Sequence, residues 1–199
     1  MSQLKPEVER HRKPAHDINP VYLNRWSPRS FLEKEVPEEV LLSLFEAARW
    51  APSGGNIQPW RFILARTQKD REKFYPFIDE GNRIWCEKAP VLAIILSTPE
   101  SPYGHNRTHS FDAGAAWGYL ALEAVRHGLI THAMGGFDPD RAREVLHVPQ
   151  EFELLAVVAI GYQGEKDALT EKLQEREQPN DRRALSESLF EGGFDQPLG

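Results

Sequence analysis

Two continuous apolar runs constrain the fold of this chain more than any other feature. Residues 90–97 read PVLAIILS and residues 154–162 read LLAVVAIGY. Each run has the length of a strand and lacks polar alternation, so both indicate strands buried in the interior. Helical patterns lie before and between them, over residues 37–50, 108–127 and 139–147. Because strands and helices alternate, the sequence predicts an α/β or α+β layered sandwich whose strand order and direction stay open.

The helix expected over residues 37–50 has a clear start and end. Pro37 suits the first helical position, and acidic residues follow it in the first turn. The helix ends before Pro52. Its apolar stripe consists of Val40, Leu41, Leu44, Phe45 and Ala48.

The longest expected helix covers residues 108–127 and is closed by Gly128. Residues 113–118 read AGAAWG, and such small side chains allow another helix to approach closely. This face is a candidate dimer contact, and a tight core contact is an equally common alternative. Shorter patterns predict strands over residues 61–66 and 129–132, a helix over 68–75, and a helix capped by Asp138.

The composition favours one soluble domain. The 199 residues are enough to bury a sizeable core, and the net charge of −6 argues against nucleic acid or an anionic membrane as a partner. The single cysteine, Cys86, leaves no intramolecular disulfide possible, which fits a reducing compartment. No apolar run approaches the roughly 20 residues of a membrane span. We therefore expect a cytoplasmic protein with neither a nucleic-acid nor a membrane partner.

The two ends of the chain differ from its centre. Residues 1–20 are polar and charged, which predicts a flexible N-terminal arm. Residues 166–199 begin as a polar linker and end in a tail with several apolar side chains. Leu185, Leu189, Phe190 and Phe194 are too apolar for a free tail. We expect this tail to dock, with another subunit as a possible site.

The stretch ARWAPSGGNIQPWRF, residues 48–62, is the candidate wall of a ligand pocket. Two prolines bracket a turn with adjacent glycines, and such a backbone can approach a ligand closely. The polar and conformationally special residues of the turn are Pro52, Ser53, Gly54, Gly55, Asn56, Gln58 and Pro59. A plain connector needs fewer such residues.

A second candidate site lies in the segment RWSPRSF, residues 25–31. If this segment is extended, Arg25, Ser27 and Arg29 point to one side, where they form a good phosphate site. The alternative is two solvated arginines.

Known catalytic motifs are missing. The chain has no Gly-Lys-Ser/Thr phosphate loop and no GxGxxG after a strand. His105 and His109 have metal-ligand spacing but lack an intervening glutamate, so we expect no metal. Ser53 is not in a nucleophile elbow, and Cys86 fits a core position better than a reactive thiol. The remaining constellation suits a phosphate-bearing cofactor that carries its own chemistry.

Four segments resemble the FMN-dependent nitroreductase family: RWSPRSF at 25–31, ARWAPSGGNIQPWRF at 48–62, AMGGFD at 133–138 and RRAL at 182–185. The resemblance covers the chain from about residue 22. It implies an α+β fold, a three-layer α/β/α sandwich around a mixed sheet, built as an intertwined homodimer. Residues 21–165 would form the FMN-binding domain, and residues 166–199 would dock on the partner subunit.

The resemblance also implies which residues bind FMN. Arg25, Ser27 and Arg29 would contact the phosphate and the pyrimidine edge, whereas the Gly135 backbone N–H would lie near flavin N5. No catalytic side chain is implied, because FMN carries the chemistry. The full implied set is Arg25, Trp26, Ser27, Arg29, Pro52, Ser53, Gly54, Asn56, Asn82, Met134, Gly135, Gly136, Arg182 and Arg183.

The implied activity is a ping-pong transfer of electrons from NADH or NADPH, through FMN, to a small-molecule acceptor. The acceptor could be a nitroaromatic, a quinone or another conjugated compound. Where some family members carry an acidic residue, this chain has Gly135. No side chain at this position would therefore select the electron acceptor. The alternatives are a flavin-binding protein without turnover, and a specialised member such as a reductive dehalogenase or a flavin-fragmenting enzyme.

Overall fold

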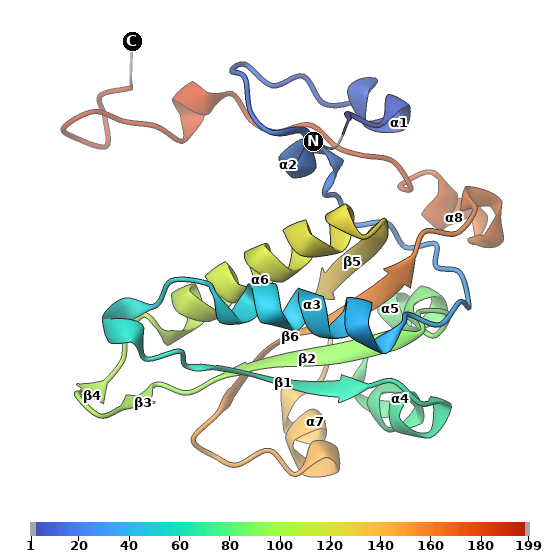
Figure 1. Cartoon of the computed structure of the whole chain (residues 1–199), viewed down its shortest axis with the longest axis vertical. Helices are drawn as coiled ribbons and strands as arrows, with labels where there is room; N and C mark the ends of the chain where they lie inside the picture. The colour runs from blue at the N-terminus through green and yellow to red at the C-terminus, as the bar shows by residue number, and fades with distance from the viewer. Residues whose placement is uncertain (1–2, 198–199) are drawn as a thin grey trace.

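The chain folds into three layers. The structure is a computed structural model that describes residues 3–197. Its main sheet has the strand order β1 (Trp60–Ala65), β2 (Val91–Ser97), β6 (Glu153–Tyr162) and β5 (Leu129–Met134). Helices cover both faces of this sheet (Figure 1). The predicted α+β three-layer sandwich is therefore confirmed.

The sheet is antiparallel rather than mixed. The pairings β1–β2, β2–β6 and β6–β5 are all antiparallel. The expected mixed sheet is thus corrected for the described strands. A continuous apolar run indicates that a strand is buried on both faces. Because such burial occurs in parallel and in antiparallel sheets, the run does not indicate the direction of the neighbouring strands.

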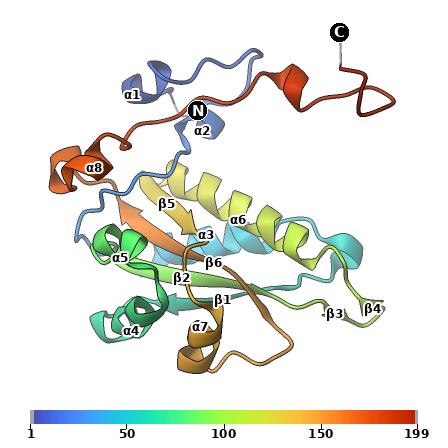
Figure 2. The ribbon, with the colours of Figure 1, turned by 180° about the vertical axis from the view of Figure 1, so that it is seen from behind.

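The helices divide between the two faces. The long helices α3 (Glu38–Arg49) and α6 (His109–Arg126) lie side by side on one face (Figure 1). Helices α4 (Gln68–Phe74), α5 (Glu80–Cys86) and α7 (Pro139–Leu146) lie on the other face (Figure 2). The remaining short elements are α1 (Pro6–Glu9), α2 (Pro20–Asn24), α8 (Glu171–Gln174), η1 (Gly54–Asn56), η2 (Tyr75–Phe77), η3 (Lys166–Ala168), η4 (Leu185–Glu187), β3 (Glu100–Ser101) and β4 (Gly104–His105).

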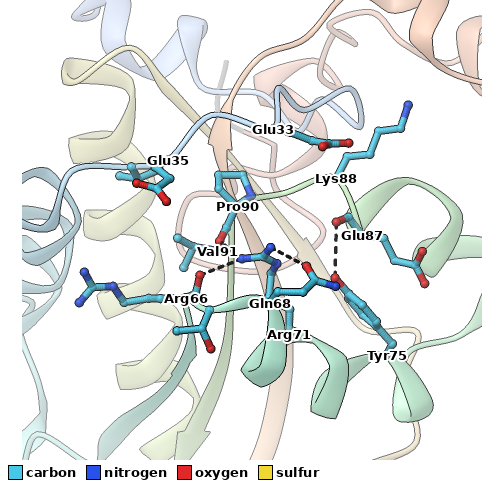
Figure 3. Close-up of a pocket in the computed structure, with 12 residues that line it drawn as sticks. Glu33, Glu35, Arg66, Gln68, Arg71, Tyr75, Glu87, Lys88, Pro90 and Val91 are labelled. Carbon is cyan, nitrogen blue, oxygen red and sulfur yellow. Dashed lines mark hydrogen bonds between the residues drawn. The ribbon is translucent and has the colours of Figure 1, made fainter.

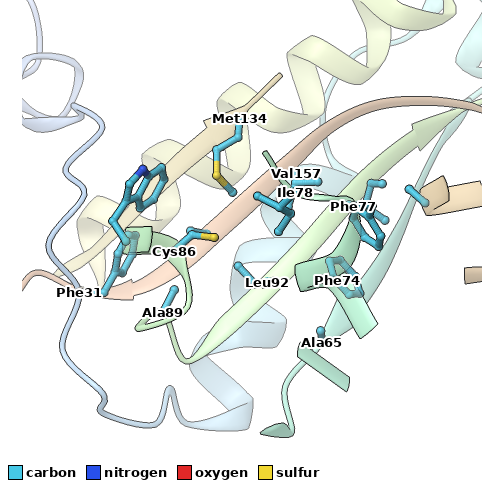
Figure 4. Packing of buried hydrophobic residues seen from close by; sticks show 14 of the residues in the cluster. Phe31, Ala65, Phe74, Phe77, Ile78, Cys86, Ala89, Leu92, Met134 and Val157 are labelled. Carbon is cyan, nitrogen blue, oxygen red and sulfur yellow. The ribbon is translucent and has the colours of Figure 1, made fainter. Parts of the chain in front are cut away.

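Strand β2 explains why its sequence is apolar throughout. Its side chains alternate between two cores, because successive residues of a strand point to opposite faces. Ala93 and Ile95 pack with α3 and α6, whereas Leu92 and Ile94 pack with α4 and α5. Figure 4 shows Leu92 among the aromatic and aliphatic side chains of the second core. Fully burying one such aliphatic side chain contributes about 1.5–3 kcal/mol to stability.

The local predictions were accurate for the longer elements and for α4 and β1, but several other short elements were missed. Asp138 caps α7 as expected, since its side chain accepts from Arg141 N. Strand β5 runs two residues beyond the predicted 129–132, and therefore into the glycine-bearing turn. Helices α2 and α5 and the β3–β4 hairpin were not predicted. Each is seven residues or shorter, so no complete apolar period marks it in the sequence.

The N-terminal arm and the C-terminal extension lie side by side above α6 in both views (Figures 1 and 2), and Arg12 donates a hydrogen bond to the Asn180 carbonyl oxygen. The expected flexible arm is partly fastened: Val8 is fully buried, and Asn24 accepts from Lys5 N at 2.9 Å. The tail instead exposes its apolar side chains, with Leu185 52% and Phe194 85% exposed. Within residues 3–197 the tail is thus not docked on its own chain. No helix of that range is long and apolar enough to cross a membrane.

Candidate functional site

The segment that follows α2, residues 25–31, is called the arginine segment below. It is extended, and its side chains alternate between two sides. From Arg25 to Ser30, burial alternates: Trp26, Pro28 and Ser30 are buried, and the residues between them are half-buried. Arg25, Ser27 and Arg29 therefore share one side, as predicted from the sequence. The Arg25 guanidinium lies 3.4 Å from Ser27 Oγ, which accepts from it.

This segment forms one wall of a cavity of about 460 Å³, which we call the arginine cavity. The opposite wall comes from the C-terminal extension, beginning after α8 and including Arg182. Five arginines line the cavity against one carboxylate. The lining residues are Arg12, Arg25, Trp26, Ser27, Arg29, His132, Glu175, Arg176, Gln178, Asn180 and Arg182.

The arginines repel one another in this cavity. Burial, followed by the charges of Arg182 and Arg25, lowers the pKa of Arg12 to about 10. The pKa of Arg25 is lowered by burial and then by Arg182, and that of Arg29 by burial and then by Arg176. Because an arginine stays protonated at neutral pH, the cavity carries uncompensated positive charge. A bound dianion would relieve the repulsion and gain charge-assisted hydrogen bonds.

Glu177 fixes the backbone of the arginine segment. Its buried carboxylate accepts from Arg29 N at 2.8 Å and from Ser30 N at 2.9 Å. The Arg29 guanidinium lies 4.0 Å from the same carboxylate. The C-terminal extension thus holds its own chain's arginine segment in place. Sequence reasoning missed Glu177, because its partners are 147 and 148 residues away.

His132, on β5, holds the arginine segment through a hydrogen bond to its backbone. Its Nδ1–H donates to the Pro28 carbonyl oxygen at 2.9 Å, and its ring lies 4.6 Å from the Trp85 ring. Burial lowers its pKa to about 4, and the charges of Arg29 and Arg25 act in the same direction. His132 is therefore neutral at neutral pH, with Nε2 unprotonated. Nothing in the sequence pattern singled it out.

The turn after β5 brings Asn82 to Gly136. The Asn82 amide donates to the Gly136 carbonyl oxygen at 3.2 Å. A Cβ on Gly136 would lie 2.6 Å from Asn82 Nδ2 and 2.7 Å from Asp79 Oδ2, so a larger residue there would displace both side chains. The neighbouring Gly135 is exposed, whereas Met134 is buried in the core. Met134 could thus meet a ligand only through its backbone.

The turn within residues 52–58 is shaped by backbone geometry. Gly55, Asn56 and Gln58 all have positive φ. Ser53 Oγ accepts from Gln58 N at 3.0 Å, and Gly54 N donates to the buried Asp112 carboxylate at 3.3 Å. Ser53 is therefore a turn-forming residue in this structure, which fits our rejection of it as a nucleophile.

A single chain does not bring all the predicted site residues together. The turn that contains Pro52, Ser53, Gly54 and Asn56 lies beside the β3–β4 hairpin, at the far end of α3 from the arginine segment (Figure 1). None of these four residues lines the arginine cavity, and neither does Arg183. The structure thus groups Arg25, Trp26, Ser27, Arg29 and Arg182 in one place, with the turn elsewhere.

A larger cavity, of about 950 Å³, lies near α4 (Figure 3). Its charges compensate one another, with Glu33, Glu35 and Glu87 facing Arg66, Arg71 and Lys88. Arg71 already donates to the carbonyl oxygens of Arg66 and Pro90, both at 2.8 Å. This cavity holds none of the predicted site residues. We therefore take the arginine cavity as the candidate site despite its smaller volume.

The same fold occurs in a solved oxidoreductase. A crystal structure described as an oxidoreductase containing FMN superposes with a TM-score of 0.89 at 42% identity, covering 93% of this chain and 96% of that one. An NADH dehydrogenase of Thermus thermophilus is 28% identical over 186 aligned residues, with 77% of this chain and 90% of that protein covered. An iodotyrosine deiodinase of Thermotoga neapolitana is 26% identical, with 69% and 84% covered.

These likenesses place the chain among the α+β oxidoreductases. The model of the nitroreductase family matches residues 22–84 and 78–162, which is more than half of the chain. The chain therefore belongs to the nitroreductase family. The resemblance inferred from the four sequence segments is confirmed.

Proposed function

We propose that this protein is an FMN-dependent oxidoreductase that takes electrons from NADH or NADPH and passes them to a small conjugated acceptor. The arginine cavity is the observation that carries the proposal. Its excess of guanidinium groups, beside the Ser27 hydroxyl, suits a phosphate dianion. The FMN in the solved oxidoreductase and the name of the Thermus relative support the cofactor and the donor.

The residues divide the binding of FMN between them. Arg25, Ser27, Arg29 and Arg182 would hold the phosphate. Asn82 and the Gly135–Gly136 backbone would lie along the flavin edge, where a backbone N–H orients a ring without titrating. When bound, FMN supplies the hydride and electron chemistry. The neutral His132 adds no titrating charge to the site at neutral pH.

We further propose that the functional unit is a homodimer. The turn of residues 52–56 lies away from the arginine cavity of its own chain. The tail also leaves Leu185 and Phe194 exposed. Both observations support a site completed by the partner's turn and a tail that docks on the partner. Pro52, Ser53, Gly54 and Asn56 would then contact the flavin from the second subunit, and Arg183 would reach the phosphate only in the dimer.

Purified protein tests the proposal directly. A flavin absorbance spectrum that persists through gel filtration would support FMN binding. Anaerobic bleaching of that spectrum by NADH or NADPH would support reductase activity. Bound flavin that neither donor bleaches would instead indicate a flavin-binding protein without turnover. Colourless protein that takes up no added FMN would refute the proposal.

One comparison favours a second candidate activity, reductive dehalogenation. The Thermotoga relative is named an iodotyrosine deiodinase. The reduced enzyme should therefore be offered nitroaromatics, quinones and halogenated phenols in parallel. Halide release faster than nitro or quinone reduction would favour the second candidate, and the reverse order would favour the first.

A further inference from the structure

Arg12 connects the two walls of the candidate site. It lies in the N-terminal arm, outside the residues that the family model matches, and its side chain is buried, with 6% of the residue exposed. It also lines the arginine cavity. None of the sequence motifs pointed to it. A buried guanidinium on an otherwise polar arm calls for an explanation, because burying a charge is costly unless hydrogen bonds satisfy it.

Its hydrogen bonds reach both walls of the cavity. On one side, Nη1 donates to the carbonyl oxygens of Leu23 at 2.7 Å and Arg25 at 2.8 Å. On the other side, Nε donates to the Asn180 carbonyl oxygen at 2.9 Å, and Nη2 donates to Asn180 Oδ1 at 3.3 Å. One planar group thus joins the start of the arginine segment to the C-terminal extension.

This arrangement positions the cationic groups of the cavity. The bond to the Arg25 carbonyl fixes the backbone from which the Arg25 guanidinium projects. Asn180 in turn accepts from Arg182 Nη1 at 3.1 Å, so the same contact sets the opposite wall. The four bonds leave one N–H of Arg12 without a partner among the described residues, on a group that lines the cavity.

We infer that Arg12 is a positioning residue for the cofactor phosphate, and that the N-terminal arm is therefore part of the cofactor site. The inference rests on the proposed FMN site. Arg12 holds Arg25 and Arg182 at a fixed separation and adds its own positive charge beside them. A lysine cannot replace it, because an ammonium lacks the planar fork that reaches several acceptors at once.

The test compares two flavins that differ only in the phosphate. Apoprotein is titrated with FMN and with riboflavin, and flavin fluorescence reports binding. Arg12→Ala should weaken FMN binding about tenfold or more, the loss expected for a charge-assisted hydrogen bond. Riboflavin binding should change less than about threefold, since it has no phosphate. Lys13→Ala is the matched control: it removes one positive charge from an exposed neighbour and should leave both affinities unchanged.

A second variant, Arg12→Lys, keeps the inference testable if Arg12→Ala folds poorly. Arg12→Lys keeps the charge, and it should still weaken FMN binding selectively. Equal losses of FMN and riboflavin affinity in both variants would overturn the inference, because they indicate a general structural role. Unchanged FMN affinity in both variants would overturn it as well. If wild-type apoprotein binds no FMN, the proposed function itself fails, which is a different result from a wild type that binds and a variant that binds equally well.

Discussion

The buried histidine of β5 leads to a prediction about stability and pH. The pKa of His132 is lowered from 6.5 to about 4 in the folded chain, mainly by burial. Between these two values the unfolded state binds a proton that the folded state does not. Stability must therefore fall as the pH falls from 6.5 toward 4, and the full loss is present below 4.

The size of the effect follows from the two pKa values. Each tenfold rise in proton concentration between them lowers the free energy of unfolding by about 1.4 kcal/mol. The complete loss is then about 3 kcal/mol, of which about 2 kcal/mol is reached at about pH 5. Such a loss is a large share of the stability of an ordinary domain, about 5–15 kcal/mol.

Urea unfolding of the apoprotein at about pH 7 and about pH 5 measures this loss. Apoprotein is needed because a bound phosphate would attract the imidazolium and raise its pKa. His132→Asn is the comparison, since its amide can still donate to the Pro28 carbonyl oxygen. The wild type should lose about 2 kcal/mol more than this variant between the two pH values. Parallel losses in the two proteins would refute the reasoning.

Four further predictions follow from other parts of the structure. Arg25→Ala should weaken FMN binding by about 1.5–3 kcal/mol in equilibrium titrations, and unchanged affinity would remove Arg25 from the site. Cys86 is fully buried with its pKa raised to about 12, so a thiol reagent should label it only in denaturant. Gly161→Ala would place a Cβ 2.6 Å from Pro90 Cδ and should lower stability by about 1–3 kcal/mol in urea melts. Ending the chain at Arg183 should shift the protein from dimer to monomer in light scattering, and a persistent dimer would contradict the proposed role of the tail.

The layered fold was predictable because its main elements are long and strongly patterned. The apolar run of β2 required burial on both sides, and α6 carried a full helical pattern closed by Gly128. The short helix α5 was missed, although Trp85 and Cys86 within it are core residues. The helix α4 is equally short, but it was predicted because Pro76 limits it and its residues are charged helix formers, whereas α5 contains Gly81 and has no side-chain N-cap.

The candidate site was predictable only where its residues adjoin in the sequence. Alternation placed Arg25, Ser27 and Arg29 on one side from a local pattern alone. Glu177 and His132 act on that segment through contacts across more than a hundred residues, and no local pattern records such contacts. The family resemblance supplied the tail arginines, of which the structure brings Arg182 to the cavity and leaves Arg183 outside it.

The bracing of the arginine segment by both chain ends has a consequence for the order of folding. The bonds from Arg12 to Asn180 span 168 residues, and those from Glu177 to the segment span 147 and 148. Contacts this distant form late, since the loop they close is entropically costly. During synthesis, the layered core can assemble while the last residues are still inside the ribosome. The arginine cavity is then the final part of the molecule to form, so a chain truncated before Glu177 would keep its layered core but lose the contacts that brace this cavity.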